Sequence, residues 1–404
     1  MQSVREREHV SRRPRPPKNT QSRANKRNEQ PGLLEVGIDY TLYISVIFLV
    51  LIGIVMVFSA SYYVAVAIQG RSRFHYVRMQ SIAAAIGFVL MFGLSKINYN
   101  FLKRWVALGY WFSIGLLVAV LIPGVGSAAG GAQRWLFIPG IPVGIQPSEI
   151  AKITGILMVS HVIATDPDKT MKTFMGLCKV GFYIVLPVAL VGAQNLSTAI
   201  VITVIGFGIV FVASPYTMPF VLMGLSGVGA ITAYLAFFAE GFRSARFAAW
   251  QDPFAYATTT GFQTVQSLFA IGSGGIFGLG LGQSRQKLGF IPEAHNDIIF
   301  SIIVEELGIL GGAIILFLFG VFLWRALKIA IQSGDLFGSL VATGIAVMIG
   351  VQVLINVGVV TNAIPNTGVP LPFISYGGTS LSITVASMGI LLSISRYREK
   401  SRTL

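Results

Sequence analysis

The stretch LYISVIFLVLIGIVMVFSASYYVAV, residues 42–66, decides the fold class of this chain. It contains no charged residue, and about 20 apolar residues are enough to cross the hydrocarbon core of a bilayer. The stretch is too long for the apolar core of a signal peptide, and it follows a long polar tail. We therefore expect a first transmembrane helix that stays in place.

The rest of the chain repeats this pattern. Of its 404 residues, 54% are hydrophobic and 11% are charged, whereas a soluble domain carries about 25% charged residues. Apolar windows that are long enough, or nearly long enough, to cross a membrane lie at residues 42–66, 77–95, 105–122, 148–164, 177–193, 196–213, 218–240, 297–324, 338–361 and 376–395. The chain is predicted to be an all-α polytopic membrane protein with about ten transmembrane helices.

The distribution of basic residues predicts how the chain is oriented. Residues 1–39 form a basic tail that we expect to be disordered, and residues 398–404 form a second, short tail. Ten spans place both termini on one side of the membrane. The tails and the loops on that side carry an excess of Lys and Arg, which predicts that the side is cytoplasmic. Residues 241–296 then form a large extracytoplasmic loop between helices 7 and 8. Because membrane orientation accounts for the net charge of +14, no nucleic-acid partner is expected.

Asp297 lies where an ordinary apolar span does not place a carboxylate, at the junction between a polar loop and an apolar run. Such a group is costly unless it is solvated, paired or functional. The loop before it carries four basic residues: Arg243, Arg246, Arg285 and Lys287. Acid and base thus converge at one face of the membrane, which predicts a surface site for an anionic, lipid-linked substrate.

Two further residues are spaced like helical neighbours of Asp297. Glu293 and Ser301 are each four residues away, so a helix that begins by Pro292 would place all three on one face. The helix dipole by itself favours an acid in the first turn, which is a structural alternative for both carboxylates. It does not account for the basic loop that leads to them. Asp297 is therefore a candidate functional residue, and Glu293 is a second candidate.

Four charged residues are predicted to form structural ion pairs within the spans. Lys152 follows Glu149 by three residues, and Glu305 and Glu306 lie deeper in the eighth span than Asp297. Charges inside a bilayer are normally paired, so Lys152 is expected to pair with one of these glutamates.

The sequence also excludes several kinds of site. Cys178 is the single cysteine, so no intrachain disulfide is possible. The glycine-rich stretch at residues 272–282 lacks the Gly-Lys-Ser/Thr ending of a phosphate loop, so it predicts close backbone packing or a re-entrant turn. In the first outer loop, Trp135 and Arg134 are typical of interfacial anchors, with a phosphate contact by Arg134 as the less favoured alternative.

The stretch LPFISYGGTS, residues 371–380, closely resembles the signature of the SEDS family, whose branches are FtsW, RodA and SpoVE. Other stretches match in the family's order: GAQRW at 131–135, QPSE at 146–149 with Lys152, Trp250 with Asp252-Pro253, PEAHND at 292–297, and EELG at 305–308. The resemblance extends from about residue 40 to 397. The stretches at 282–287 and 293–295 are more similar to the FtsW and SpoVE branch than to RodA.

The resemblance implies a ten-helix peptidoglycan glycosyltransferase of the bacterial plasma membrane. Such an enzyme polymerises lipid II into glycan strands at the outer face, for cell division in the FtsW branch. It implies a class B penicillin-binding protein as the crosslinking partner, along with other division or elongation proteins. The residue that matches the family's catalytic acid is Asp297. The expected substrate-binding residues are Arg134, Trp135, Arg243, Arg246, Arg285, Lys287, Glu293, His295, Ser375 and Tyr376.

Two questions stay open at this point. Asn195 stands where the family commonly has an aspartate, and an amide neither titrates nor acts as a base, although it can still form hydrogen bonds. The metal requirement is unknown, and a divalent cation remains a candidate cofactor. The alternative function is a flippase or transporter of lipid II, in which Lys152, Glu305 and Glu306 would form a relay or gate.

Overall fold

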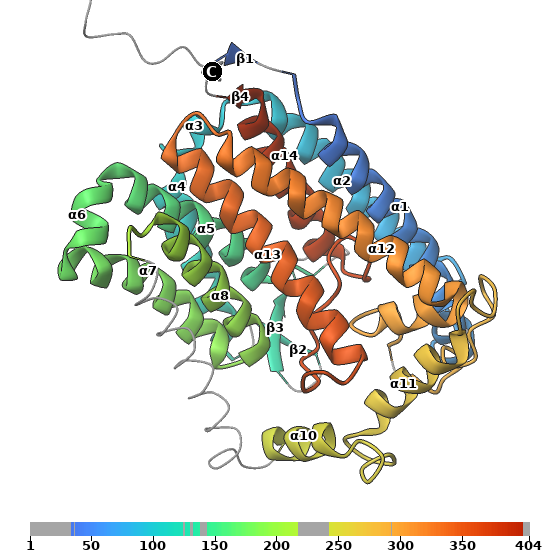
Figure 1. Ribbon diagram of the computed structural model, residues 1–404. Helices are drawn as coiled ribbons and strands as arrows, with labels where there is room; N and C mark the ends of the chain where they lie inside the picture. The colour runs from blue at the N-terminus through green and yellow to red at the C-terminus, as the bar shows by residue number, and fades with distance from the viewer. Residues whose placement is uncertain are drawn as a thin grey trace, which may run out of the picture.

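The computed structural model describes residues 34–35, 37–123, 126–129, 132–137, 144–216, 242–291 and 293–398. These residues form a bundle of long helices with two short antiparallel pairs of strands (Figure 1). Of the predicted disordered tail at residues 1–39, residues 1–33 and 36 lie outside the described residues, as do the predicted span at 218–240 and residues 399–404 of the short tail.

Eight helices of the described residues are long and apolar enough to cross a membrane. They are α1 with its π-helical extension η2 (Tyr40–Tyr63 and Val64–Ile68), α2 (His75–Lys96), α5 (Pro147–Thr165), α7 (Phe174–Gly192), α8 (Leu196–Ala213), α12 (Ile299–Ile331), α13 (Leu336–Val360) and α14 (Gly378–Arg396). Each corresponds to one of the predicted windows. The predicted span at 105–122 is α4 (Val106–Leu121), a shorter apolar helix.

The remaining elements are short and lie at the two ends of the bundle. They are α3 (Tyr99–Leu102), α6 (Pro167–Lys172), α10 (Phe242–Gln251), α11 (Phe262–Gly274), and the strand pairs β1 (Leu34–Glu35) with β4 (Tyr397–Arg398) and β2 (Gly126–Ala129) with β3 (Ala132–Leu136). In Figure 1, α10 and α11 lie at one end of the bundle, and β1 and β4 at the other. We call the first the loop end, which also holds the loop at residues 361–377, and the second the tail end.

The centre of the bundle is built on α13 and α14, which are the most buried of the candidate spans. Helix α14 packs along α2, and small residues permit the close approach. A Cβ atom added to Gly87 would lie 2.9 Å from Val385 Cβ, and one added to Gly389 would lie 2.4 Å from the carbonyl oxygen of Met91. Small residues are the usual means by which membrane helices pack closely. This packing holds the loop between α13 and α14 in place at the loop end.

Candidate active site

Asp297 lies at the loop end, two residues before α12 begins at Ile299. Its backbone carbonyl accepts a hydrogen bond of 2.7 Å from Nδ2 of Asn356 in α13, and the same amide nitrogen donates to the carbonyl of Val369 at 2.8 Å. Asp297 also faces the loop at residues 361–377. A Cβ atom added to Gly368, which has a φ of 67°, would lie 3.3 Å from Asp297 Oδ2. Asn356 therefore fixes the backbone of Asp297 and the neighbouring loop together.

The helix begins later than the sequence predicted, and this changes the place of Glu293. Its φ of 50° lies in the left-handed region, and its exposed carboxylate accepts a 2.6 Å hydrogen bond from Asn296 Nδ2. Ser301 is buried and donates to the carbonyl of Ile298 at 2.8 Å. The prediction of one helical face shared by Glu293, Asp297 and Ser301 is wrong, because the segment before Ile299 is a turn and not a helix.

Two arginines from separate elements contribute to the site: Arg246 lies near Asp297, and Arg134 lies near Arg246. Arg246 of α10 donates from Nη1 to the carbonyl of Asn366 at 3.3 Å. Arg134 of β3 donates from Nε and Nη2 to the carbonyl of Gln194, at 3.2 and 3.0 Å. Partial burial lowers the pKa of both guanidinium groups. The charge of Asp297 raises the pKa of Arg246, and the charge of Arg134 lowers it. Arg246 thus interacts electrostatically with both Asp297 and Arg134.

Burial is the main influence on the carboxyl group of Asp297. It raises the pKa of Asp297 above the usual value, because a low-dielectric environment disfavours the charged form. The hydrogen bond with its own backbone lowers the pKa, the charge of Glu293 raises it, and Arg246 lowers it. A carboxylate whose pKa is raised toward the working pH is a stronger base than an ordinary aspartate. The site can therefore accept a proton beside the positive charge of Arg246.

Three of the other predicted substrate-binding residues make contacts within the protein next to Asp297. His295 is 2% exposed, and its ring packs against Tyr76 and Tyr376, with centroid distances of 4.3 and 5.4 Å. Burial lowers the pKa of His295 to about 4, so the ring is neutral at neutral pH. Tyr376 donates its backbone N–H to the carbonyl of His295 at 2.9 Å. Ser375 Oγ accepts a hydrogen bond from the backbone of Leu371 at 2.8 Å. These contacts join the loop at 361–377 to the segment that carries Asp297.

The remaining predicted residues fall in different surroundings. Trp135 is half-buried in β3 beside Arg134, and Arg285 is exposed. The backbone of Arg243 lies in α10, but its side chain is outside the description. Lys287 is 5% exposed, and its ammonium lies 2.7 Å from Glu306 Oε1. The structure thus replaces the phosphate contact expected of Lys287 with a buried ion pair.

The other buried pair joins Lys152 to Glu149, whose Oε2 lies 2.9 Å from Lys152 Nζ. The same carboxylate oxygen accepts a hydrogen bond of 2.9 Å from Ser380 of α14. Of the three glutamates predicted as partners of Lys152, Glu149 is therefore the one that forms the ion pair. Glu305 and Glu306 are both fully buried and make their polar contacts with the segment at residues 282–287 and with α1, as described below.

Two polar residues that hold the site together were missed by the sequence reading. Asn356 is one of them. Gln80 of α2 is the other, since it donates to the carbonyl of Ser375 at 3.1 Å and accepts from the backbone of Gly377 at 3.2 Å. Both are amides inside apolar helices, where an unpaired polar group is costly. That feature was the signal that would have identified them.

The structure offers no ready set of protein ligands for a metal ion within the part of the chain that it describes, where no three His, Cys, Asp or Glu side chains are grouped. The charges at the site include the carboxylates of Asp297 and Glu293 and the guanidinium groups of Arg246 and Arg134. This arrangement suits an anionic substrate, and the divalent cation stays a prediction.

The fold and the site define a multi-pass membrane protein with an acid–base site at one end of its helical bundle. Residues 40–400 match the model of the FtsW/RodA/SpoVE family, described as cell cycle protein. The chain belongs to this family.

Named relatives agree with this assignment. Stage V sporulation protein E of Bacillus subtilis (strain 168) is 38% identical over 368 residues, which cover 89% of this chain and 97% of the relative. The probable peptidoglycan glycosyltransferase FtsW of Geobacter sp. (strain M18) is 36% identical, with the same two shares covered.

Solved structures show the same fold. A chain from a study of the structural coordination of polymerization and crosslinking by a peptidoglycan synthase complex superposes with a TM-score of 0.74. It is 27% identical, and 91% of this chain and 100% of that chain are covered. The crystal structure of the rod shape determining protein RodA of Thermus thermophilus gives a TM-score of 0.66 at 27% identity, with 91% and 99% covered.

Proposed function

We propose that this chain is a peptidoglycan glycosyltransferase that polymerises lipid II into glycan strands at the outer face of the bacterial plasma membrane, for cell division. The observation that carries the proposal is the position of Asp297, a partly buried carboxylate that interacts electrostatically with Arg246 at the loop end. Family membership and the names of the FtsW relatives support the choice of substrate and reaction.

The proposed topology has ten transmembrane helices and both termini in the cytoplasm. The eight candidate spans, α4 and the predicted span at 218–240 make up the ten. Basic residues at the tail end support a cytoplasmic location for that end, among them Lys96, Lys103 and Arg325. The loop end, with the large loop at residues 241–296, then faces outward. A membrane domain at residues 40–397 between two cytoplasmic tails follows from this arrangement.

In the proposed mechanism, Asp297 is the general base. Its carboxylate takes the proton of the acceptor sugar's 4-hydroxyl while that oxygen attacks the anomeric carbon of the donor. The bond from the anomeric carbon to the pyrophosphate oxygen breaks, and the leaving group is a polyprenyl pyrophosphate. A single displacement inverts the configuration, so an α-linked donor gives a β-linked product and one base is enough.

The two arginines would stabilise the leaving group. Negative charge develops on the pyrophosphate as the glycosidic bond breaks, and positioned cations in a water-poor site stabilise such charge strongly. Arg246 and Arg134 belong to α10 and β3, and each is held by a backbone carbonyl. Guanidinium groups can bind phosphate with two hydrogen bonds at once.

A class B penicillin-binding protein is the proposed partner. The structure of a peptidoglycan synthase complex that coordinates polymerization with crosslinking contains a chain of this fold. A transpeptidase that crosslinks the peptides of the new strand would work beside the polymerase at the outer face. Other division or elongation proteins are proposed to join the same assembly.

The test is glycan-strand synthesis from purified lipid II by the wild-type protein and the Asp297→Asn variant in liposomes, each with and without a cognate transpeptidase. We expect polymer from the wild type, and loss of a general base typically costs about 10²–10⁴ in rate. Normal polymerisation by Asp297→Asn would reject Asp297 as the base. If no polymer forms while labelled lipid II crosses the bilayer, the flippase alternative replaces the proposed function.

A further inference from the structure

Helix α12 is broken near its outer third, and a separate segment fills the break. Gly308 has a φ of 74° and a ψ of −179°. In a continuous helix the N–H groups of Ile309 and Leu310 would bond to the carbonyls of Glu305 and Glu306. They bond instead to the carbonyls of Gly275 and Ile276, at 2.9 and 3.1 Å. The freed carbonyls of Glu305 and Glu306 accept from the N–H groups of Leu279 and Gly280, both at 2.9 Å.

The glycines of residues 272–282 make this exchange possible. A Cβ atom on Gly274 would lie 2.1 Å from the carbonyl oxygen of Val304, and one on Gly278 would lie 2.2 Å from that of Glu306. On the helix, a Cβ atom on Gly308 would lie 2.1 Å from the carbonyl oxygen of Ile276. These distances leave no room for a side chain. The glycine run is thus a backbone insert in α12, which we call the insert (residues 274–282).

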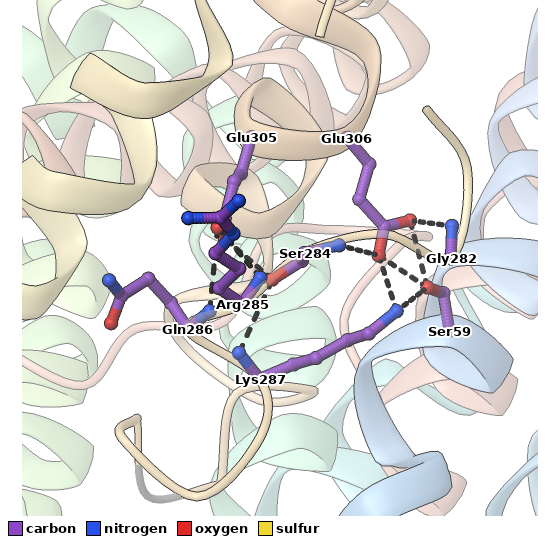
Figure 2. A network of polar contacts seen from close by, with 8 residues as sticks. All are labelled: Ser59, Gly282, Ser284, Arg285, Gln286, Lys287, Glu305 and Glu306. Carbon is purple, nitrogen blue, oxygen red and sulfur yellow. Dashed lines mark hydrogen bonds and ion pairs between the residues drawn. The ribbon is translucent and has the colours of Figure 1, made fainter. Parts of the chain in front are cut away.

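The chain that follows the insert binds the two buried carboxylates of α12, as Figure 2 shows. Glu305 accepts hydrogen bonds from Ser284 Oγ at 2.5 Å and from the backbone N–H of Arg285 at 2.8 Å. Glu306 accepts from the backbone N–H of Gly282 at 2.9 Å. The segment at residues 282–287 therefore satisfies both acids with backbone and side-chain donors.

Lys287 connects this segment to two helices at once. Its ammonium donates to Glu306 Oε1 at 2.7 Å and to Ser59 Oγ of α1 at 2.8 Å, and Ser59 itself donates to Glu306 at 2.6 Å (Figure 2). Lys287 is 5% exposed and Glu306 is fully buried. Removal of one partner from a buried ion pair leaves an uncompensated charge, and the structure around it must adjust.

The part of α12 before the break, residues 299–307, carries Asp297 at its outer end. On one side Asn356 holds the backbone of Asp297. On the other side the insert and the contacts of Glu305 and Glu306 hold the base of the same short helical segment. Arg246 belongs to α10 and is anchored to Asn366. The distance between the carboxylate and this guanidinium therefore depends on how the segment at 299–307 is tilted.

We propose that Lys287 is a positioning residue for the polymerisation reaction. Through Glu306 and Ser59 it fixes the tilt of the segment at 299–307, and thereby the place of the Asp297 carboxylate between the acceptor hydroxyl and the arginines. This inference rests on the proposed function. It differs from a phosphate contact, because the ammonium is enclosed by Glu306 and Ser59 in the interior of the protein.

The test measures the kinetics of glycan-strand synthesis by the full-length protein with its transpeptidase, for the wild type and Lys287→Met. Since misplacement of a reacting group by about 1 Å can cost about 100-fold, we expect kcat to fall by about 10- to 100-fold, with KM for lipid II changed by less than about threefold. The acidic limb of the kcat profile should also move to higher pH, because a carboxylate farther from Arg246 keeps its proton more strongly.

Two further variants keep the test decisive. Ser59→Ala retains both charges of the pair and should lower kcat by about threefold, again with KM unchanged, as expected for a smaller displacement. In Lys287→Met/Glu306→Gln the unpaired charge is gone, and part of the lost kcat should return, since contacting residues show coupled effects. Lys103→Met removes the partner of Asp335 in another 2.7 Å pair, at the tail end, and serves as the matched control with normal kcat.

Each contrary result has a distinct meaning. A raised KM with normal kcat would overturn the proposal in favour of direct contact with the substrate. Normal kcat and KM per folded molecule, with only a lower melting temperature, would overturn it in favour of a folding role. In either case polymer formation by the wild type and its loss in Asp297→Asn would leave the proposed function in place.

Discussion

Three aspartates precede long helices of this bundle, and the fold uses them differently. Asp39 lies before α1 and Asp335 before α13, both at the tail end, whereas Asp297 lies before α12 at the loop end. Asp39 Oδ1 accepts from the N–H of Leu42 at 3.1 Å, and Asp335 Oδ1 accepts from that of Gly338 at 3.0 Å. Both carboxylates are N-caps, which satisfy donors that a helix leaves free at its start.

Their charges are also paired. Asp39 forms a 2.5 Å ion pair with Arg325 of α12, and Asp335 forms a 2.7 Å pair with Lys103 and accepts from Tyr99 Oη at 2.7 Å.

Asp297 is not the N-cap of the helix that follows it. The N-cap position of α12 is Ile298, and no side chain caps this helix. Burial without a cap role makes this carboxylate costly, and natural proteins tolerate such local conflicts mainly at functional sites. The difference between the two ends teaches that the position of an acid relative to the N-cap separates the two structural carboxylates from the one proposed to be catalytic.

The largest expected effect separates Asp297→Asn from Asp39→Asn. Asp297→Asn should lose about 10²–10⁴ in rate and keep its folding stability, because it removes a charge that the fold does not use. Asp39→Asn should lose about 3 kcal/mol of stability, since it leaves a largely buried Arg325 without its partner, and keep normal activity per folded molecule. Thermal unfolding and lipid II polymerisation, measured on the same preparations, test both. Comparable losses of activity per folded molecule in the two variants would show that Asp297 and Asp39 do not differ in this way.

The comparison becomes sharper in the pH dependence of the rate. Because the charge of Arg246 lowers the pKa of Asp297, Arg246→Gln should raise that pKa. The base is active when ionised, so activity is lost as the pH falls through its pKa, and in the variant this loss should begin at higher pH. The measurement is kcat against pH for the wild type, Arg246→Gln and Arg285→Gln. Arg285→Gln is the control, because it removes the same charge from an exposed arginine of the same loop. An equal shift in both variants would point to a general change of charge.

The apolar windows predicted the helices well, because a span must bury its own backbone hydrogen bonds and needs a fixed length of apolar sequence. The sequence also indicated Asp297 as a candidate functional residue, because a carboxylate at the mouth of a span is rare. Charge and position in the outer loops are the only features that predict Arg134 and Arg246.

Other features depend on contacts between distant residues and could not be derived from local patterns. The start of α12 differs from the prediction, because Glu293 has a left-handed backbone conformation that residues other than glycine seldom adopt. Lys287 was assigned to phosphate, because nothing in its local sequence predicts burial against Ser59, 228 residues away. Asn356 and Gln80 are detectable as amides inside apolar helices, but the loop backbone groups that they bind have no sequence signature. The glycine run predicted close packing but not its partner, the break at Gly308.

The smallest expected effect concerns a fourth helix start, at α8. Asn195 is its N-cap, and its Oδ1 accepts from the N–H of Thr198 at 3.2 Å. An aspartate caps a helix about as well as an asparagine, and its charge at a helix N-terminus adds about 0.3–1 kcal/mol. Asn195→Asp should therefore raise the unfolding free energy by less than about 1 kcal/mol, whereas Asn195→Ala should lower it by about 1 kcal/mol.

The same pair of variants tests whether the role of Asn195 is to cap a helix, as Asp39 and Asp335 do. If capping is its role, Asn195→Asp should polymerise lipid II at a rate within about twofold of the wild type, since the interaction with the first turn is preserved. Polymerisation assays with and without added Mg²⁺ or Mn²⁺ provide the measurement. A large gain in rate, or a new dependence on the cation, would instead place a charge at this position within the active site. Because Arg134 binds the carbonyl of the adjacent Gln194, such a result would move the catalytic centre toward β3 and α8.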